Sequence, residues 1–342
     1  MEWPPAAHYR HMTFTDHSPI PHIDTVTDPF DGPDDLRQRW RALMGPLGFS
    51  ERILWFIFTE DSRMLPTACQ LELPDRPDAF LADVFLMRLH DLAAGVSGLT
   101  EQHARADVLL GMLTDLGVAT VVLAHDSVSA YLAANGFAEG VTCAVGTGVV
   151  TLGVGPAGVA RVDGWGHLYG DAGSGYWIGR AGIEAALRDF DGRGTHTALT
   201  RITEEVFGSL PELYMVLQGS PDRVSRTAAF AKRVDAAAAG GDVVAQDICR
   251  RAAAELATSA GAALTRSGWS AGRPARISWM GNVLARSELI RDTFIATMTE
   301  LAPAATIGPP GGTTLDGVTA LLELPAGHPL GDSVTRAGPP GR

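Results

Sequence analysis

Lysine is almost missing from this sequence: of the 27 basic residues in a chain of 342, the one lysine is Lys232. A GxxxxGK[ST] phosphate loop requires a lysine directly after a glycine-rich turn. Lys232 follows Phe230 and Ala231, with no glycine run before it. The sequence therefore excludes this class of nucleotide site, and any phosphate binding must come from other groups.

Positive charge and cysteine are scarce as well. The formal net charge of −12 argues against a general nucleic-acid-binding protein, because binding to phosphates requires clustered positive charge. Cys69, Cys143 and Cys249 lie far apart without CxxC spacing, so neither a disulfide framework nor a cysteine-based zinc site is predicted. The first residues lack the basic start and apolar run of a signal peptide. We expect a cytoplasmic protein with no metal ligands, no nucleic-acid partner and no membrane segment.

The order of the predicted elements indicates an α/β protein, and the chain is long enough for about two domains. Residues 1–35 lack hydrophobic periodicity and are predicted to form an irregular tail. Residues 36–136 are predicted to form an atypical N-terminal lobe, and residues 137–324 a C-terminal lobe rich in helices. We expect a flexible tail at 325–342.

The N-terminal lobe contains three segments with clear patterns. An apolar run from Ile53 and a segment that ends at Leu73 flank a polar turn, which predicts a β-hairpin. A helix is predicted from Asp78, its cap, to Leu92, the last apolar residue at helical spacing. A buried strand that ends at His125 is predicted to follow.

Asp126 stands at the carboxyl end of that strand, where α/β sheets place their ligand crevice. A carboxylate there could accept the proton of an attacking hydroxyl. It could equally cap the helix predicted over 127–135, because aspartate is favoured at helix N-caps. The residues alone leave both roles open.

Gly146-Thr147-Gly148 joins two strand-like runs of the C-terminal lobe. Glycines permit positive φ, and consecutive N–H groups in such a turn can form an anion-binding concavity. A tight hairpin turn also requires glycine for purely conformational reasons. Taken alone, this turn therefore leaves both interpretations open.

The segment 163–179 contains six glycines, two tryptophans and two aspartates, a composition too costly in chain entropy for a plain connector. Trp165 offers an apolar platform for the face of a sugar or base, and Asp171 can accept hydrogen bonds from neighbouring hydroxyls. The alternative is that Trp165 and Trp177 pack in the core while Asp171 or Ser174 caps the next helix.

An ordered series of motifs resembles one protein family. The series comprises Ala94-Gly95, Asp126-Ser127, Gly146-Thr147-Gly148, Gly164-Trp165-Gly166, the glycine-rich run from Gly170 to Gly179, Asp191-Gly192-Arg193-Gly194 and Trp279-Met280-Gly281-Asn282. It is similar to the N-acetylglucosamine kinase group of the BadF/BadG/BcrA/BcrD-type ATPases, in the actin/hexokinase superfamily, over about residues 94–324.

This resemblance implies an actin-like, ribonuclease H-like ATPase fold with a complete C-terminal lobe. It implies ATP, with Mg²⁺, in the cleft between two lobes and phosphorylation of N-acetylglucosamine or a related amino sugar, and it is compatible with a homodimer. The implied roles are Asp126 as general base, Trp165, Gly166 and Asp171 in the sugar pocket, Gly146, Thr147 and Gly148 as second phosphate loop, and Gly281 and Asn282 beside the adenosine. Phosphoryl transfer depends on positioning and charge neutralisation, so a Walker lysine is not required.

One motif of the family has no counterpart in this sequence. Its members begin with a strand, a phosphate-binding turn of the type Asp-Gly-Gly-Gly-Thr-Lys, and a second strand. The nearest substitute, the predicted hairpin turn from Thr59 to Arg63, has no glycine and two carboxylates. We therefore expect an incomplete or replaced first lobe and impaired use of ATP. A non-catalytic sugar-binding pseudokinase or sensor is one alternative, and an N-terminal third that arose by gene fusion or a displaced reading frame is another.

Overall fold

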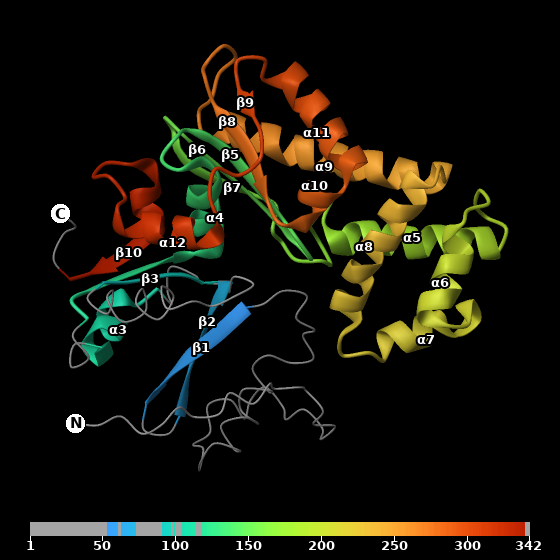
Figure 1. Cartoon of the computed structure of the whole chain (residues 1–342), viewed down its shortest axis with the longest axis horizontal. Helices are drawn as coiled ribbons and strands as arrows, with labels where there is room; N and C mark the ends of the chain where they lie inside the picture. The colour runs from blue at the N-terminus through green and yellow to red at the C-terminus, as the bar shows by residue number, and fades with distance from the viewer. Residues whose placement is uncertain are drawn as a thin grey trace, which may run out of the picture. The chain divides into compact units, whose positions relative to one another are not determined.

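The computed structural model describes residues 53–60, 63–72, 91–96, 99, 104–113 and 118–338 (Figure 1). The first described elements are strands β1 (Ile53–Glu60) and β2 (Arg63–Glu72), which form a two-stranded sheet. This confirms the predicted hairpin, whereas the tail at 1–35 and the predicted cap Asp78 lie outside the described residues.

A three-stranded sheet leads to the candidate base, because Asp126 directly follows its central strand. Its order is β10-β4-β3, with strands β3 (Asp91–Val96), β4 (Thr120–His125) and β10 (Val334–Ala337). Strand β3 runs parallel to β4, so that Val96 lies opposite His125. Helices α3 (Ala106–Leu113), α4 (Asp126–Asn135) and α12 (Thr314–Leu322) accompany this sheet. The predicted strand ending at His125 and the helix after it are confirmed.

Two expectations for this region were wrong. Leu92 lies in strand β3, opposite Val121 of β4, and not in a helix. The tail expected to be flexible contains β10, in which Val334 pairs antiparallel with Ala124 of β4. Helix α12 packs on α4, where a Cβ at Gly317 would lie 2.0 Å from the carbonyl oxygen of Ser129. Helix α12 and strand β10 therefore pack with α4 and β4, which the sequence analysis assigned to the N-terminal lobe.

A five-stranded sheet forms the centre of the second layer. Its order is β7-β6-β5-β8-β9, with strands β5 (Gly140–Val145), β6 (Val149–Gly155), β7 (Gly158–Val162), β8 (Arg276–Met280) and β9 (Thr306–Ile307). Val141, Cys143 and Val145 alternate along β5 and are buried against the helices of one face, as period-two alternation predicts. Leu152 and Val154 of β6 instead join the core formed with α4 and α12. The sheet thus has a helix layer on each face.

Helices dominate the chain between β7 and β8 and between β8 and β9. They are α5 (Gly175–Phe190), α6 (Leu199–Phe207), α7 (Leu213–Gln218), α8 (Arg223–Ala239), α9 (Val243–Arg266), α10 (Asn282–Arg286) and α11 (Glu288–Leu301). Figure 1 shows α9 and α11 beside the five-stranded sheet, with α6 and α7 at the end away from it. Helix α5 packs closely on α8, because Gly179 brings its backbone against Thr227.

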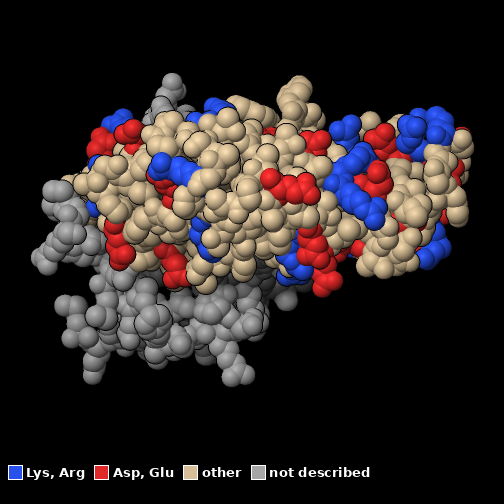
Figure 2. Space-filling model, turned by 90° about the horizontal axis from the view of Figure 1, so that it is seen from above, with Lys and Arg blue, Asp and Glu red and all other residues tan. Residues whose placement is uncertain are grey.

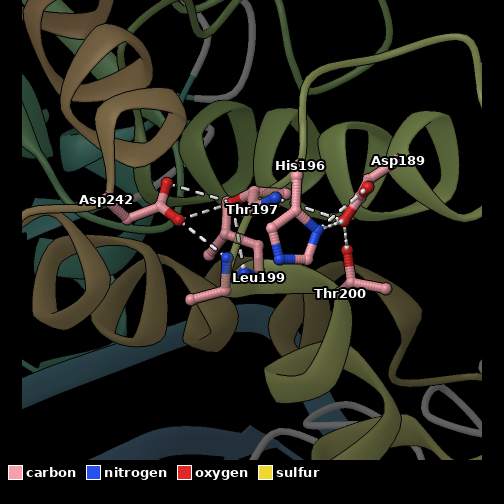
Figure 3. A network of polar contacts seen from close by, with 7 residues as sticks. Asp189, His196, Thr197, Leu199, Thr200 and Asp242 are labelled. Carbon is pink, nitrogen blue, oxygen red and sulfur yellow. Dashed lines mark hydrogen bonds and ion pairs between the residues drawn. The ribbon is translucent and has the colours of Figure 1, made fainter.

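The loop between α5 and α6 is held by two carboxylates (Figure 3). Asp242, the N-cap of α9, accepts hydrogen bonds from Ala245 N–H at 2.8 Å, Ala198 N–H at 2.7 Å and the Thr197 hydroxyl at 2.9 Å. Asp189 accepts hydrogen bonds from the Thr200 hydroxyl and from Thr197 N–H. These bonds fix the loop that carries the Asp191-Gly192-Arg193-Gly194 motif to the ends of α5 and α9.

The surface mixes charges of both signs. On the face in Figure 2, acidic and basic side chains lie next to each other. Among the described residues, Arg251 and Asp247 form an ion pair at 2.8 Å, and Arg273 and Glu139 form another at 2.8 Å. Among the described helices, none combines the length and the apolar character needed to cross a membrane.

Candidate active site

The turn Gly146-Thr147-Gly148 connects β5 to β6 and is attached to the start of α5. Gly175 N–H donates to the carbonyl oxygen of Gly146 at 2.8 Å, and Tyr176 N–H donates to that of Thr147 at 3.0 Å. Trp177 N–H is bound by the hydroxyl of Ser174, the N-cap of α5, at 3.2 Å. The first amides of α5 are therefore engaged. Within the turn, Gly146 N–H donates to the carbonyl oxygen of Gly148 at 2.9 Å, so an anion here would be bound by the amides of Thr147 and Gly148.

A pocket of ≈ 240 Å³ begins at this turn. Gly146 and Thr147 line it together with Asn282 at the start of α10. The predicted phosphate turn and the predicted adenosine-bordering residue therefore meet in one cavity. Lys232 and Arg286 also line it and bring two cationic side chains, which the sequence analysis did not assign to the site.

Gly281 makes the sharp turn between β8 and α10. Its φ is +87°, and a Cβ at this position would lie 2.4 Å from the carbonyl oxygen of Val145. Only glycine combines this backbone conformation with so close an approach. Gly281 therefore places Asn282 at the pocket without lining the pocket itself.

Asp171 lies beneath the phosphate turn. Its side chain is buried, and a Cβ at Gly148 would lie 2.7 Å from its Oδ2. Burial raises the pKa of Asp171, the nearby Asp163 carboxylate raises it further, and a hydrogen bond from the Val149 backbone opposes the rise. The predicted phosphate turn and the predicted sugar residue Asp171 are therefore neighbours.

Asp163 organises the backbone around Asp171 and was missed as a site residue. Its Oδ1 accepts Gly164 N–H and Asp171 N–H, both at 2.8 Å, and its Oδ2 accepts Ala172 N–H at 2.9 Å. Asp163 and Asp171 both have a φ of +58°, a left-handed conformation that aspartate tolerates better than most residues. The available sequence signal was an aspartate before a glycine at the start of a glycine-rich segment.

Trp165 is exposed rather than packed in the core, with 70% of its surface accessible. The Arg161 guanidinium lies 6.0 Å from the centre of its ring. Gly166, at φ +81°, has open space where a Cβ would be. The core-packing alternative is thus wrong for Trp165, whereas Trp177 packs partly buried against the core and Ser174 caps α5, as that alternative proposed.

Asp126 is the first residue of α4, and the N-cap is the preceding His125. The alternative role of Asp126 as the helix cap is therefore wrong. Its carboxylate Oδ1 lies 2.8 Å from Nδ1 of His125, and its side chain is 42% exposed. The candidate base thus stands at the carboxyl end of β4, as the sequence predicts, in contact with a histidine.

A larger pocket, of ≈ 470 Å³, lies elsewhere, between α5 and α9. Arg188, Gly194 and Asp247 are among the residues that line it, and no predicted site residue does. Within the described residues, no group of three or more His, Cys, Asp or Glu side chains could hold a metal ion.

Sequence comparison identifies the family and its relatives. Residues 89–300 match the BadF/BadG/BcrA/BcrD ATPase family. An N-acetylmuramic acid/N-acetylglucosamine kinase of Clostridium acetobutylicum is 33% identical over 153 residues, 44% of this chain and 50% of the relative. An N-acetyl-D-glucosamine kinase of Dictyostelium discoideum is 43% identical over 67 residues, 19% of this chain and 21% of the relative. The chain thus spans about half the length of the first relative and about a fifth of the length of the second.

Solved structures share the fold. A Chromobacterium violaceum protein provisionally described as an N-acetylglucosamine kinase has a TM-score of 0.54 and 21% identity, over 80% of this chain and 99% of that one. A Porphyromonas gingivalis protein described in the same way has a TM-score of 0.54 and 16% identity, over 78% and 93%. The predicted actin-like α/β ATPase fold is confirmed. With its match over 89–300, this chain belongs to the BadF/BadG/BcrA/BcrD ATPase family.

Proposed function

We propose that this protein transfers the γ-phosphoryl group of ATP to a hydroxyl of an amino sugar of the N-acetylglucosamine type. The observation that carries the proposal is the pocket in which Gly146 and Thr147 meet Asn282, Lys232 and Arg286. Backbone amides and two cations suit a polyphosphate anion. Asp235 also lines the pocket, and its carboxylate accepts a hydrogen bond from the Ser287 hydroxyl. The amino sugar is inferred from the Clostridium relative, which is described as a kinase of such sugars. Since ATP is available in the cytoplasm, we propose that the reaction takes place there.

In this reaction Asp126 acts as the general base. Its carboxylate takes the proton of the sugar hydroxyl, the hydroxyl oxygen forms a bond to the γ-phosphorus, and the bond from that phosphorus to the β–γ bridging oxygen breaks to release ADP. The amides of Thr147 and Gly148 and the cations Lys232 and Arg286 offset the negative charge of the phosphates. When bound with ATP, Mg²⁺ would neutralise the charge that develops on the phosphates, and the described residues offer no group of three or more His, Cys, Asp or Glu side chains to hold it apart from the nucleotide.

The sugar lies on the other side of the phosphate turn in this proposal. Asp171, beside Gly148, accepts hydrogen bonds from sugar hydroxyls. The exposed ring of Trp165 covers an apolar face of the sugar, and Gly166 leaves room for it. In this proposal the acceptor hydroxyl points from the sugar toward the γ-phosphate held at the turn.

A second candidate function is a non-catalytic sugar-binding pseudokinase or sensor. It is favoured by one observation: the sequence has one of the two glycine-rich phosphate turns of the family, Gly146-Thr147-Gly148, and no Asp-Gly-Gly-Gly-Thr segment. Loss of the amides of one turn would weaken the hold on the β- and γ-phosphates.

Coupled measurement of ADP release with MgATP and a panel of hexosamines tests the kinase. We expect turnover with an N-acetylated hexosamine and a loss of at least about 100-fold in kcat for Asp126→Asn, the usual contribution of a general base. Titration calorimetry separates the second candidate. Sugar binding with no MgATP binding supports the sensor, and MgATP binding with turnover rejects it.

A further inference from the structure

His125 contacts three polar groups through a single ring nitrogen. Its Nδ1 lies 3.1 Å from Ser127 N, 2.8 Å from Ser127 Oγ and 2.8 Å from Oδ1 of Asp126. The imidazole is largely buried, with 19% of its side chain exposed, and Ser127 is buried too. These contacts hold the ring beside the candidate base. Because the ring is largely buried, water has little access to the contact between His125 and Asp126.

One nitrogen cannot satisfy all of these neighbours at once. To cap α4, Nδ1 must offer its lone pair to the N–H of Ser127. To bind the carboxylate of Asp126, Nδ1 must instead carry a proton and donate it. The position of the ring proton therefore decides between capping the helix and holding Asp126.

We propose that His125 is a positioning residue for Asp126 in the phosphoryl transfer described above, on which this inference rests. With a proton on Nδ1, the ring donates to Asp126 and fixes the direction of the carboxylate, and the Ser127 hydroxyl remains beside it. Without that proton, the ring caps α4 and the carboxylate loses this donor. A base held in one direction meets the sugar hydroxyl productively more often than a base that rotates.

Four charged side chains that the structure describes on elements near α4 have partners of their own. Arg336 of β10 donates to the carbonyl oxygens of Leu321 and Leu322, and Arg276 of β8 donates to those of Ala134 and Pro309. Asp316 of α12 is bound to Thr313, and Asp107 of α3 to Arg105. Among the described residues, Asp126 is thus the charged group in contact with His125.

His328 provides an internal comparison. Its Nδ1 accepts Leu330 N–H at 3.2 Å and caps the short helix Pro329–Ser333, as His125 can cap α4. Its Nε2 lies 3.3 Å from the carbonyl oxygen of Phe137. Among the described residues no carboxylate contacts the His328 ring, so the contact with Asp126 distinguishes His125 from a histidine that only caps.

The kinetic test compares His125→Asn with His328→Asn. Asparagine is a good N-cap, so neither variant should unfold at a much lower temperature than the wild type. We expect His125→Asn to lower kcat about 10- to 100-fold, with the KM for ATP nearly unchanged, and to alter the shape of the pH profile of kcat. His328→Asn should leave kcat and its pH profile unchanged. A His125→Asn enzyme with the kcat and pH profile of the wild type would overturn the proposal.

A second test does not depend on activity. Nitrogen-15 NMR of the histidine rings shows which nitrogen carries the proton in the wild type and in Asp126→Ala. We expect a proton on Nδ1 of His125 in the wild type and a shift of that proton to Nε2 in Asp126→Ala, while the His328 ring stays the same. An Nδ1 without a proton in both proteins contradicts the inference. If no hexosamine supports turnover in the wild type, the kinase proposal fails, and this measurement still decides whether the His125 ring donates to the Asp126 carboxylate.

Discussion

Asp163 Oδ1 accepts the backbone N–H of Asp171 at 2.8 Å, so that one aspartate holds the backbone of a second aspartate at the candidate sugar pocket. The other oxygen of Asp163 accepts Ala172 N–H at 2.9 Å. Asp171 in turn lies against the phosphate turn at Gly148. Asp163, which touches neither ligand in the proposed reaction, therefore holds the residue at which the two predicted subsites meet.

Replacement of Asp163 by alanine should loosen this segment. Three hydrogen bonds to backbone amides would be lost, and we expect a decrease of about 2–3 kcal/mol in the free energy of unfolding together with weaker sugar binding. Asp163→Asn keeps the acceptor for Gly164 and Asp171 but places an NH₂ group opposite Ala172. Its free energy of unfolding should therefore decrease less than that of Asp163→Ala. Denaturant titration and sugar calorimetry on both variants provide the check. Equal stability of Asp163→Ala and wild type would refute this role.

Gly281→Ala should lower the free energy of unfolding more than an alanine substitution at another glycine with positive φ. At Gly192, φ is +78° and a Cβ would meet nothing within 4 Å, so Gly192→Ala reports backbone strain alone, about 1 kcal/mol. At Gly281 the Cβ would also collide with the Val145 carbonyl oxygen at 2.4 Å, and we expect at least about 2 kcal/mol more. Thermal unfolding of the two variants measures the difference. Similar melting temperatures would contradict the close approach.

Asp242 should make the stability of the helical layer sensitive to acid. Burial raises the pKa of Asp242, but hydrogen bonds from Ala245, Ala198 and Thr197 outweigh it, and the pKa lies below its ordinary value. Because the pKa is lower in the folded state, this stabilisation is present above the unfolded value of about 3.9 and is lost as the pH falls through the folded value.

Asp242→Asn tests this sensitivity, because asparagine retains a capping oxygen without a charge. We expect a smaller difference in melting temperature between pH 7 and about pH 3 for this variant than for the wild type. Asp292→Asn is the matched control, since Asp292 is 72% exposed and should leave the difference unchanged. An unchanged difference in Asp242→Asn would exclude Asp242 as the titrating group.

Much of the site followed from the sequence because its signals are local. Strand, glycine turn and strand predicted the hairpin around Gly146-Thr147-Gly148, and an apolar run followed by His125 and Asp126 predicted a carboxylate at a strand end. Such patterns depend on neighbours in the chain, so the fold preserves them.

The missed features depend on contacts between residues far apart in the chain. Leu92 continues a helical spacing, but pairing of β3 with β4 places it in a strand. Strand β10 was missed because Val334 finds its partner, Ala124, far earlier in the chain. Arg286 and Lys232 come from two helices that only the tertiary fold brings to one pocket.

Lys232 allows a direct chemical test of the nucleotide pocket. Since the chain has one lysine, an amine-selective reagent can modify only Lys232 and the α-amino group. We expect MgATP to slow modification of Lys232 and not of the α-amino group, as measured by peptide mass spectrometry. Lys232→Ala should raise the KM for ATP about fivefold, the usual value of one exposed charge contact, and Lys232→Arg should raise it less. Equal modification rates with and without MgATP would place the nucleotide elsewhere.

Phosphorus-31 NMR of the complete reaction tests the central claim most directly, because it observes the bond that is formed. With MgATP and N-acetylglucosamine, we predict that a sugar phosphate resonance grows in step with the ADP resonances for the wild type, and that Asp126→Asn binds MgATP but forms the product at least about 100 times more slowly. A wild-type protein that binds MgATP and forms no sugar phosphate from any hexosamine, or an Asp126→Asn variant as fast as the wild type, would contradict the account.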